Sequence, residues 1–266
     1  MKLLSRPQID PRNGCFQKIT PESAGWKYVG FEAYQLQPGM PLTQETGGNE
    51  VCLVFLSGTA SVQTNDAQFD DVGERQSVFD ENINAHAVYV PANSQFSIFP
   101  KTVLEVAVCK APATGKLSSR HIKPSDVNKT TRGKGTNERF IRDILPDTAE
   151  AESLLVVEVI TPGGHWSSYP SHKHDRDALP EESFLEETYF HKFEKPQGFG
   201  FQRVYTDDGS LDEAMTIRDN DVVMVPRGYH PVAAAHGYNL YYLNVMAGPT
   251  RQWVFQTAPE HQWLMK

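Results

Sequence analysis

Short apolar runs separated by turn-forming residues dominate this chain, and the runs are too short to predict helices. Each run is rich in β-branched or aromatic residues and is bounded by Gly, Pro, Asn or Asp, a pattern typical of β-strands. We expect strands over residues 30–36, 50–56, 103–108, 154–160, 188–193, 200–205 and 239–246. No long amphipathic helical pattern competes with them, so the chain is expected to form an all-β sandwich or barrel.

The strand pattern contains a repeat. A Val-rich run ends in Pro91 in the first half of the chain and in Pro226 in the second half, and an acidic residue opens a strand about forty residues earlier in each, at Glu50 and at Glu187. The repeat predicts two related β units in one chain. We expect an N-terminal barrel over 1–115, a linker and crossover segment over 116–150, and a C-terminal barrel over 151–266.

Candidate metal ligands occur in only one copy of the repeat. His172 and His174 alternate, so in a strand they point to the same face and could grip one ion together. Glu187 and His230 from neighbouring strands would complete a four-ligand site with room for water or substrate. Aligned on the proline, the first half has Gln95 in place of His230, and no His-x-His precedes it. We therefore expect one divalent metal per chain, in the second barrel, with a structural first barrel.

Composition narrows the function class. Of 266 residues, 39% are hydrophobic and 22% are charged, and the formal charge of −8 argues against a nucleic-acid partner. No apolar run approaches the roughly 20 residues of a membrane span, and the first residues stop being apolar too early for a signal peptide. Three widely spaced cysteines fit reduced thiols, so we expect a cytoplasmic protein without membrane contact.

A polar, basic stretch over 110–137 separates the halves, and it lacks the spacing of a phosphate-binding loop. We interpret this stretch as a solvated linker. Lys134 and Arg139 nevertheless remain candidates for reaching an anionic substrate.

Five segments of the second half resemble the cupin pattern and, more specifically, the 5-deoxy-glucuronate isomerase family of myo-inositol catabolism, which is related to the 5-keto-4-deoxyuronate isomerases. The segments are 172–175, 186–190, 198–206, 225–231 and 244–248. The resemblance spans the whole chain. It implies two cupin (jelly-roll-like) barrels. It also implies a zinc site of three histidines and one glutamate, with manganese as the alternative metal.

The resemblance also implies an activity, the aldose–ketose isomerisation of 5-deoxy-D-glucuronate to 5-dehydro-2-deoxy-D-gluconate. The partner would be a small-molecule sugar acid, and assembly into a homo-oligomer stays open. Two other functions stay open as well. A cupin dioxygenase would use the same ligand types for iron, and a non-catalytic sugar-binding cupin would bind without turnover.

Strand alternation leaves two candidates for the acidic ligand, since Glu186 and Glu187 point to opposite faces. The resemblance places the ligand directly before a Thr-Tyr-Phe run, which selects Glu187. Twelve residues separate His174 from Glu187, more than the three or four usual in cupins. The insert at 175–186 is therefore interpreted as a loop at the barrel mouth, and as a candidate lid.

Roles for the remaining site residues follow from the expected chemistry. An isomerase needs a general base, for which the candidates are Tyr189, His236 and Glu186. The substrate carboxylate suits a bidentate arginine. Arg203 is the first candidate for that role, followed by Arg251 and Arg227. Tyr189, Tyr229 and Tyr242 are the tyrosines expected to contact substrate.

Overall fold

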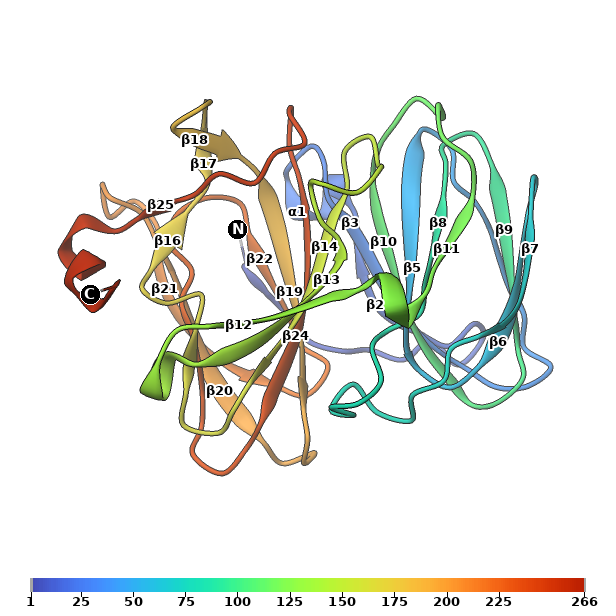
Figure 1. The fold of residues 1–266 in the computed structure, drawn as a ribbon, viewed down its shortest axis with the longest axis horizontal. Helices are drawn as coiled ribbons and strands as arrows, with labels where there is room; N and C mark the ends of the chain where they lie inside the picture. Colours follow the sequence, from blue (N-terminus) through green and yellow to red (C-terminus); the bar gives the residue numbers. More distant parts are fainter. Residues whose placement is uncertain (1, 266) are drawn as a thin grey trace. The chain divides into compact units, whose positions relative to one another are not determined.

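The computed structural model describes residues 2–265 and is almost wholly β, as the strand pattern predicts. The described chain divides into two compact units (Figure 1). Residues 7–128 and 143–156 form one unit, called the first barrel below, and residues 2–6, 129–142 and 157–265 form the other, called the second barrel. No helix among the described residues is both long and apolar enough to cross a membrane.

The first barrel is built from two sheets around an apolar interior. The strands of the larger sheet, in spatial order, are β11 (Arg120–Ile122), β8 (Ala87–Val90), β5 (Asn49–Ser57), β10 (Leu104–Pro112), β3 (Gly30–Leu36) and β2 (Cys15–Ile19). Those of the smaller sheet are β4 (Leu42–Glu45), β9 (Gln95–Pro100), β6 (Ala60–Thr64) and β7 (Gln68–Val72). Two short helices, α1 (Pro21–Ala24) and η1 (Pro124–Asp126), also belong to this unit.

Apolar side chains from both sheets pack into a single core inside the first barrel. Phe55, Val62, Phe96 and Ile98 are among its fully buried members. The interior of the first barrel is therefore filled by side chains.

The second barrel has a seven-stranded sheet, a four-stranded sheet and two short ribbons. The large sheet runs in the order β1 (Leu4–Ser5), β22 (Val222–Val225), β19 (Glu186–Phe193), β24 (Leu240–Ala247), β14 (Leu155–Thr161), β13 (Arg139–Leu145) and β12 (Asn128–Arg132). The smaller sheet contains β15 (Trp166–Ser167), β23 (Val232–Ala234), β20 (Phe199–Tyr205) and β21 (Asp212–Arg218). The ribbons pair β16 (His172–Lys173) with β25 (Gln256–Thr257), and β17 (Asp175–Ala178) with β18 (Glu182–Phe184). Two 3-10 helices, η2 (Gly135–Asn137) and η3 (Pro259–Met265), complete it.

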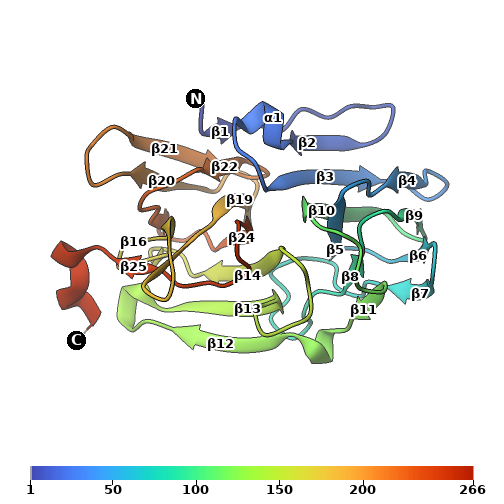
Figure 2. The same cartoon turned by 90° about the horizontal axis from the view of Figure 1, so that it is seen from above.

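The segment expected to be a solvated linker forms regular structure instead. Figure 2 shows β12, β13 and β14 side by side, and the strand order agrees. Ile141 and Ile144 in β13 are buried, and the buried Arg142 Nη1 lies 3.4 Å from Glu158 Oε1. The division of the chain therefore differs from the expected boundaries. Apolar residues of β13, which follows the basic stretch at 110–137 and lies within the expected linker at 116–150, place this segment in a sheet. The first residues differ likewise, since Leu4 and Ser5 pair with β22 of the second barrel.

Strand β19 is central to the second barrel because it is paired on both sides. Glu187 lies opposite Val225 of β22 and opposite Met246 of β24. Seven of its eight residues are buried, including polar ones, and strands enclosed in this way hold their side chains in fixed positions. Any functional group on the inner face of β19 is therefore placed with little freedom.

One buried histidine of β19 predicts a pH-dependent stability. Burial lowers the pKa of His191 to about 4, while the hydrogen bond from its Nε2 to Gln202 Oε1, at 2.9 Å, opposes the shift only in part. The unfolded chain, with a pKa near 6.5, binds the proton first as the pH falls. The contribution of His191 to the free energy of unfolding is therefore complete above pH 6.5 and is lost as the pH falls towards 4. Between pH 7 and pH 5 the free energy of unfolding should fall by about 2 kcal/mol from this group alone.

The measurement is urea unfolding at pH 7 and pH 5 for the wild type and for His191→Gln, which cannot titrate. The wild type should lose about 2 kcal/mol more than the variant over this interval. Equal losses would mean that His191 is not held neutral in the folded protein.

Candidate metal centre and substrate pocket

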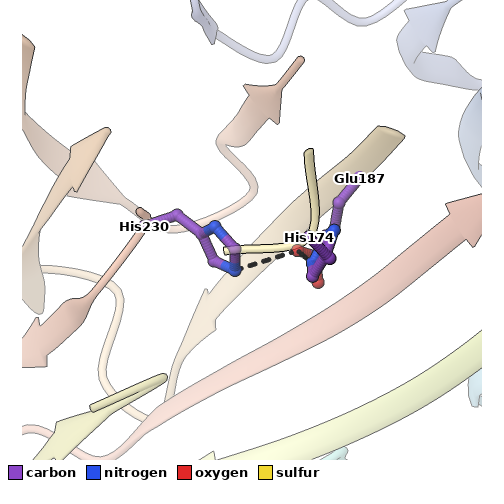
Figure 3. A group of neighbouring side chains, drawn as sticks. All are labelled: His174, Glu187 and His230. Atoms are coloured by element: carbon purple, nitrogen blue, oxygen red, sulfur yellow. Dashed lines mark hydrogen bonds and ion pairs between the residues drawn. The ribbon is translucent and has the colours of Figure 1, made fainter. Parts of the chain in front are cut away.

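Three of the four predicted metal ligands lie together in the second barrel. One ligand atom from each of His174, Glu187 and His230 lies within 4.8 Å of the other two. Glu187 Oε2 is 3.2 Å from His174 Nε2 and 3.3 Å from His230 Nε2. All three side chains are buried and are directed toward one another (Figure 3). Sequence reasoning therefore identified a real cluster.

Local backbone geometry explains how distant residues reach one point. Glu187 lies near the start of β19, and His174 directly follows β16. His230 follows a turn after β22 in which Gly228 has a φ of +89°. A Cβ atom at residue 228 would lie 2.4 Å from the carbonyl oxygen of Tyr205. Glycine is required there both for the left-handed backbone and for the close approach.

Backbone carbonyls fix the orientation of two of the imidazoles. His174 Nδ1 donates to Leu185 O at 3.0 Å, and His230 Nδ1 donates to Gly228 O at 2.9 Å. With the proton on Nδ1, each neutral ring turns its Nε2 lone pair toward Glu187. His230 Nε2 has no hydrogen-bond partner among the described residues. Two lone pairs and a carboxylate that converge on one buried point are the donor set of a divalent transition-metal ion, so these residues fit the predicted metal.

The protonation of these histidines agrees with a ligand role in part. Burial lowers the pKa of His230 to about 4 and lowers the pKa of His172 well below its ordinary value. Burial also acts to lower the pKa of His174, but the hydrogen bond and charge of Glu187 outweigh it and raise the pKa overall. His172 and His230 are therefore neutral at pH 7, the state in which imidazole binds metal.

His172 lies beside the cluster but is not one of its three members. Its ring centroid is 4.9 Å from that of His230 and 6.3 Å from that of His174. Its ring centroid is also 4.7 Å from that of Phe255. His172 is thus in contact with the three-residue cluster and also lines the space next to it.

That space is a pocket of about 400 Å³ within the second barrel. Its walls differ in chemistry. One wall is polar and includes Ser168, Tyr189, Tyr242 and Asn244; an apolar wall includes Trp253, Phe255, Leu264 and Met265; a basic edge is formed by Arg132, Lys134 and Arg139. His172 and Tyr189 line the pocket and also contact His230, so the pocket reaches the histidine cluster.

The polar wall offers several groups to a ligand. Tyr189 and Ser168 share a hydrogen bond of 2.8 Å between their hydroxyl oxygens, and Ser167 and Tyr242 share another. Burial raises the pKa of the Tyr189 hydroxyl well above its ordinary value, so it stays protonated at pH 7. Asn244, opposite Tyr189 in the sheet, has a buried amide nitrogen that makes no hydrogen bond of normal geometry among the described residues, although it lies near enough to the Tyr189 hydroxyl to act on its pKa. A buried donor with spare hydrogen-bonding capacity in a pocket wall is suited to a ligand oxygen.

The structure places several other predicted residues away from this pocket. Arg203 lies on the exposed face of β20, where it pairs with Asp212 at 2.7 and 2.8 Å. Its guanidinium also stacks on Tyr205, 4.1 Å from the ring centroid. His236 is exposed in a turn after β23. Neither is among the pocket-lining residues.

The other candidates for substrate binding and for the general base also lie mostly outside the pocket lining. Arg227 donates to Ser210 at 3.1 Å, and the Tyr229 hydroxyl donates to Asp207 at 2.9 Å. These residues, Arg251 and Glu186 are absent from the pocket lining. Only Tyr189 and Tyr242 of the expected substrate-contacting tyrosines line it.

The insert at 175–186 forms a hydrogen-bonded hairpin of β17 and β18. Glu182 is fully buried there and accepts hydrogen bonds from the Asp175 backbone N–H at 2.8 Å and from Arg176 Nε at 2.7 Å. Lys173 Nζ lies 2.6 Å from Asp175 Oδ1, and Asp175 Oδ2 accepts from the backbone of Gly228 at 2.9 Å. The hairpin is thereby tied to the turn that carries His230.

Sequence reasoning missed Ser168, Asn244 and the aromatic residues of the C-terminal segment. Trp253 and Phe255 lie in a stretch without regular structure, where no periodic pattern predicts a facing direction. Asn244 did carry a signal, because a polar amide inside an apolar strand of eight residues needs a polar neighbour or a ligand.

Comparison with known proteins identifies relatives over the full chain. A model of the KduI/IolB family matches residues 3–264. A protein of Geobacillus kaustophilus (strain HTA426) named 5-deoxy-glucuronate isomerase is 51% identical over 267 residues, covering 100% of this chain and 96% of the relative. A protein of the same name from Bacillus subtilis (strain 168) is 45% identical and covers 99% of this chain and 98% of its own.

Solved structures agree with the fold. The crystal structure of an IolB-like protein from Salmonella typhimurium LT2 matches with a TM-score of 0.97 and 49% identity, over 100% of both chains. Oxalate decarboxylase of Lactobacillus farciminis matches with a TM-score of 0.70 at 12% identity, over 98% of this chain and 89% of its own. The second likeness shows the fold alone. Together they confirm the expected all-β architecture of two cupin barrels.

Proposed function

The chain belongs to the KduI/IolB family, and on this basis we propose that it is an aldose–ketose isomerase that converts 5-deoxy-D-glucuronate to 5-dehydro-2-deoxy-D-gluconate in myo-inositol catabolism. The observation that carries the proposal is a buried His174–Glu187–His230 cluster beside a pocket with a polar wall. This chain has the cluster and the pocket. Two relatives named 5-deoxy-glucuronate isomerase match this chain over 96% and 98% of their own lengths. The setting proposed for the reaction is the cytoplasm.

The proposed metal site uses four side chains: His172, His174, Glu187 and His230. Zinc is the first choice of metal and manganese the second. Bound there, a divalent ion would supply Lewis-acid stabilisation of negative charge on sugar oxygens. The chain's own contribution is to hold the ligands before the ion arrives, through the carbonyls of Leu185 and Gly228, which lowers the cost of assembling the site.

Side chains of the polar wall position the sugar. An aldose–ketose isomerisation moves a proton from C2 to C1 and changes which oxygen carries a proton. The protonated Tyr189 hydroxyl, held by Ser168, is placed to donate to a sugar oxygen as charge develops on it. Its raised pKa favours the role of a donor over that of a general base. The side chains of Trp253 and Phe255 add apolar surface to the same pocket.

The test is to incubate purified protein with 5-deoxy-D-glucuronate and to follow the aldehyde proton by NMR, with and without a chelator. The aldehyde signal should disappear as the ketose forms, and chelation should stop the conversion. Oxygen uptake with bound iron would instead indicate a dioxygenase. Sugar binding without conversion, unaffected by chelator, would indicate a non-catalytic binding protein.

A further inference from the structure

The basic edge of the pocket contains an arginine that differs from other arginines of the second barrel. Each of four others has a carboxylate partner: Arg6 with Asp221, Arg142 with Glu158, Arg176 with Glu182 and Arg203 with Asp212. Arg139 donates from Nη1 to the carbonyl oxygen of Asn137 at 3.1 Å, and it has no acidic partner among residues 2–265. Its guanidinium therefore keeps donors and an unneutralised charge at the pocket.

Burial makes this charge more effective than an exposed one. Arg139 is half-buried, and the loss of water around it lowers the pKa of the guanidinium. Attraction to an anion strengthens as water is excluded, because the local dielectric constant falls. Arg132 and Lys134, at the same edge, have exposed side chains. They add positive potential, but Arg139 has the better-defined position.

The backbone around Arg139 is shaped to hold it. Gly133 has a φ of +81°, and a Cβ atom at this position would lie 2.9 Å from Arg139 Nη1 and 2.1 Å from Asn137 O. A side chain at 133 would thus push against both the guanidinium and its carbonyl acceptor. The basic stretch read from the sequence as a linker therefore includes a turn that positions one guanidinium.

Arg139 also faces the polar wall. Its charge acts on Tyr242 and Tyr189, and it contributes to the lowered pKa of His172, after burial and the neighbouring histidines. The buried amide nitrogen of Asn244 belongs to the same pocket lining. A ligand in this pocket would thus have both the residues beside the histidine cluster and a guanidinium within reach.

We propose that Arg139 is the residue that binds the carboxylate of the sugar-acid substrate, an assignment that rests on the proposed isomerase function and names the anion subsite of its pocket. In 5-deoxy-D-glucuronate the reacting carbons C1 and C2 and the carboxylate are at opposite ends of a six-carbon chain. With C1 and C2 near Tyr189 and the histidine cluster, the carboxylate is directed to the basic edge. The planar guanidinium then offers parallel N–H donors to its two oxygens.

The kinetic test compares Arg139→Gln and Arg139→Lys with the wild type. Loss of a charge-assisted contact should raise KM for 5-deoxy-D-glucuronate by about 10- to 100-fold in Arg139→Gln, while metal content and melting temperature stay near wild type. Arg139→Lys should recover part of the loss. For the analogue with a primary alcohol in place of the carboxylate, kcat/KM should be the same in the wild type and in Arg139→Gln. Arg203→Gln is the competing variant, and Arg12→Gln, in the first barrel, is the matched control.

Binding of D-glucuronate, measured by calorimetry, separates this proposal from the proposed function because it needs no turnover. Binding that is lost in Arg139→Gln supports the subsite even if the wild type fails to isomerise 5-deoxy-D-glucuronate. An unchanged KM and unchanged binding in a folded Arg139→Gln variant overturn the subsite while leaving isomerase activity intact. A large rise in KM for Arg203→Gln alone would give the carboxylate to Arg203. A wild type that neither turns over nor binds would overturn both proposals.

Discussion

Replacing His230 with alanine is expected to abolish metal binding and turnover together. His230 Nε2 is fully buried, has no hydrogen-bond partner among the described residues and lies 3.3 Å from Glu187 Oε2. Removal of an outer hydrogen-bonding partner of a metal ligand already costs about 10- to 100-fold in affinity or activity. Loss of the ligand itself should cost at least about 100-fold in both. Elemental analysis of the purified variant, with the NMR assay on the same sample, measures the two effects.

Two further variants sharpen this test. His121→Ala, a matched histidine change in the first barrel, should keep metal content and turnover close to those of the wild type. Wild-type protein should contain one divalent ion per chain. A His230→Ala variant with full metal and full turnover would contradict the assignment, and a stoichiometry near two would mean that the first barrel also binds. Loss of turnover in His236→Ala would restore a role for that exposed histidine.

The strands could be predicted well because their signals are local. The expected strand at 30–36 coincides with β3, and that at 200–205 differs from β20 by one residue. Alternation within a strand is likewise visible in the sequence. The neighbouring sheet decides which of the two faces of a strand points inward. The pattern of residues within a single strand does not show it.

Arg203 is a residue whose facing direction the strand pattern did not predict. Phe199, Phe201 and Arg203 share one face of β20, and two aromatic residues make this face look like the buried one. In the structure all three are exposed, and Gln202 and Val204 point inward. The arginine chosen from the sequence is therefore on the outer side of the barrel, paired with Asp212.

The cluster of His174, Glu187 and His230 was predictable for a different reason. Histidine and glutamate side chains at strand ends have few alternative roles, and the repeat showed that only one half contains them. The pocket was less predictable because it is assembled from segments far apart in the chain, 132–141, 168–172, 242–244 and 253–265. Their meeting depends on β12 and β13 joining the large sheet of the second barrel, and the basic composition of this segment conceals that.

The repeat places Glu50 and Glu187 at corresponding positions, and the structure gives them different partners. The Glu50 carboxylate accepts hydrogen bonds from the Tyr89 hydroxyl at 2.6 Å and from the backbone N–H groups of Glu152 and Ser153 at 2.8 and 2.6 Å. It also accepts from the backbone of Leu154. Glu50 is fully buried. In the first barrel, the position that holds a metal-cluster carboxylate in the second barrel therefore binds the segment 152–154.

Glu50→Ala should consequently destabilise the protein without altering its chemistry. Two of the four hydrogen bonds, those from the Tyr89 hydroxyl and the Leu154 N–H, are buried. Each buried donor left without an acceptor costs about 1–3 kcal/mol, so the free energy of unfolding should fall by about 2–6 kcal/mol. Urea unfolding measures this loss, and kcat of the folded fraction at low temperature should equal that of the wild type. The matched control is Gln95→Ala, because Gln95 is exposed and its side-chain amide donates to Glu45 Oε1 at 2.6 Å, a contact at the surface.

Gln95→Ala should change stability by no more than about 0.5 kcal/mol and should leave metal content and turnover unchanged. A large fall in kcat in either variant, with folding intact, would show that the first barrel contributes to the chemistry. Its role would then be catalytic as well as structural. If both variants keep kcat while only Glu50→Ala loses stability, the same position of the repeat serves folding in one barrel and chemistry in the other.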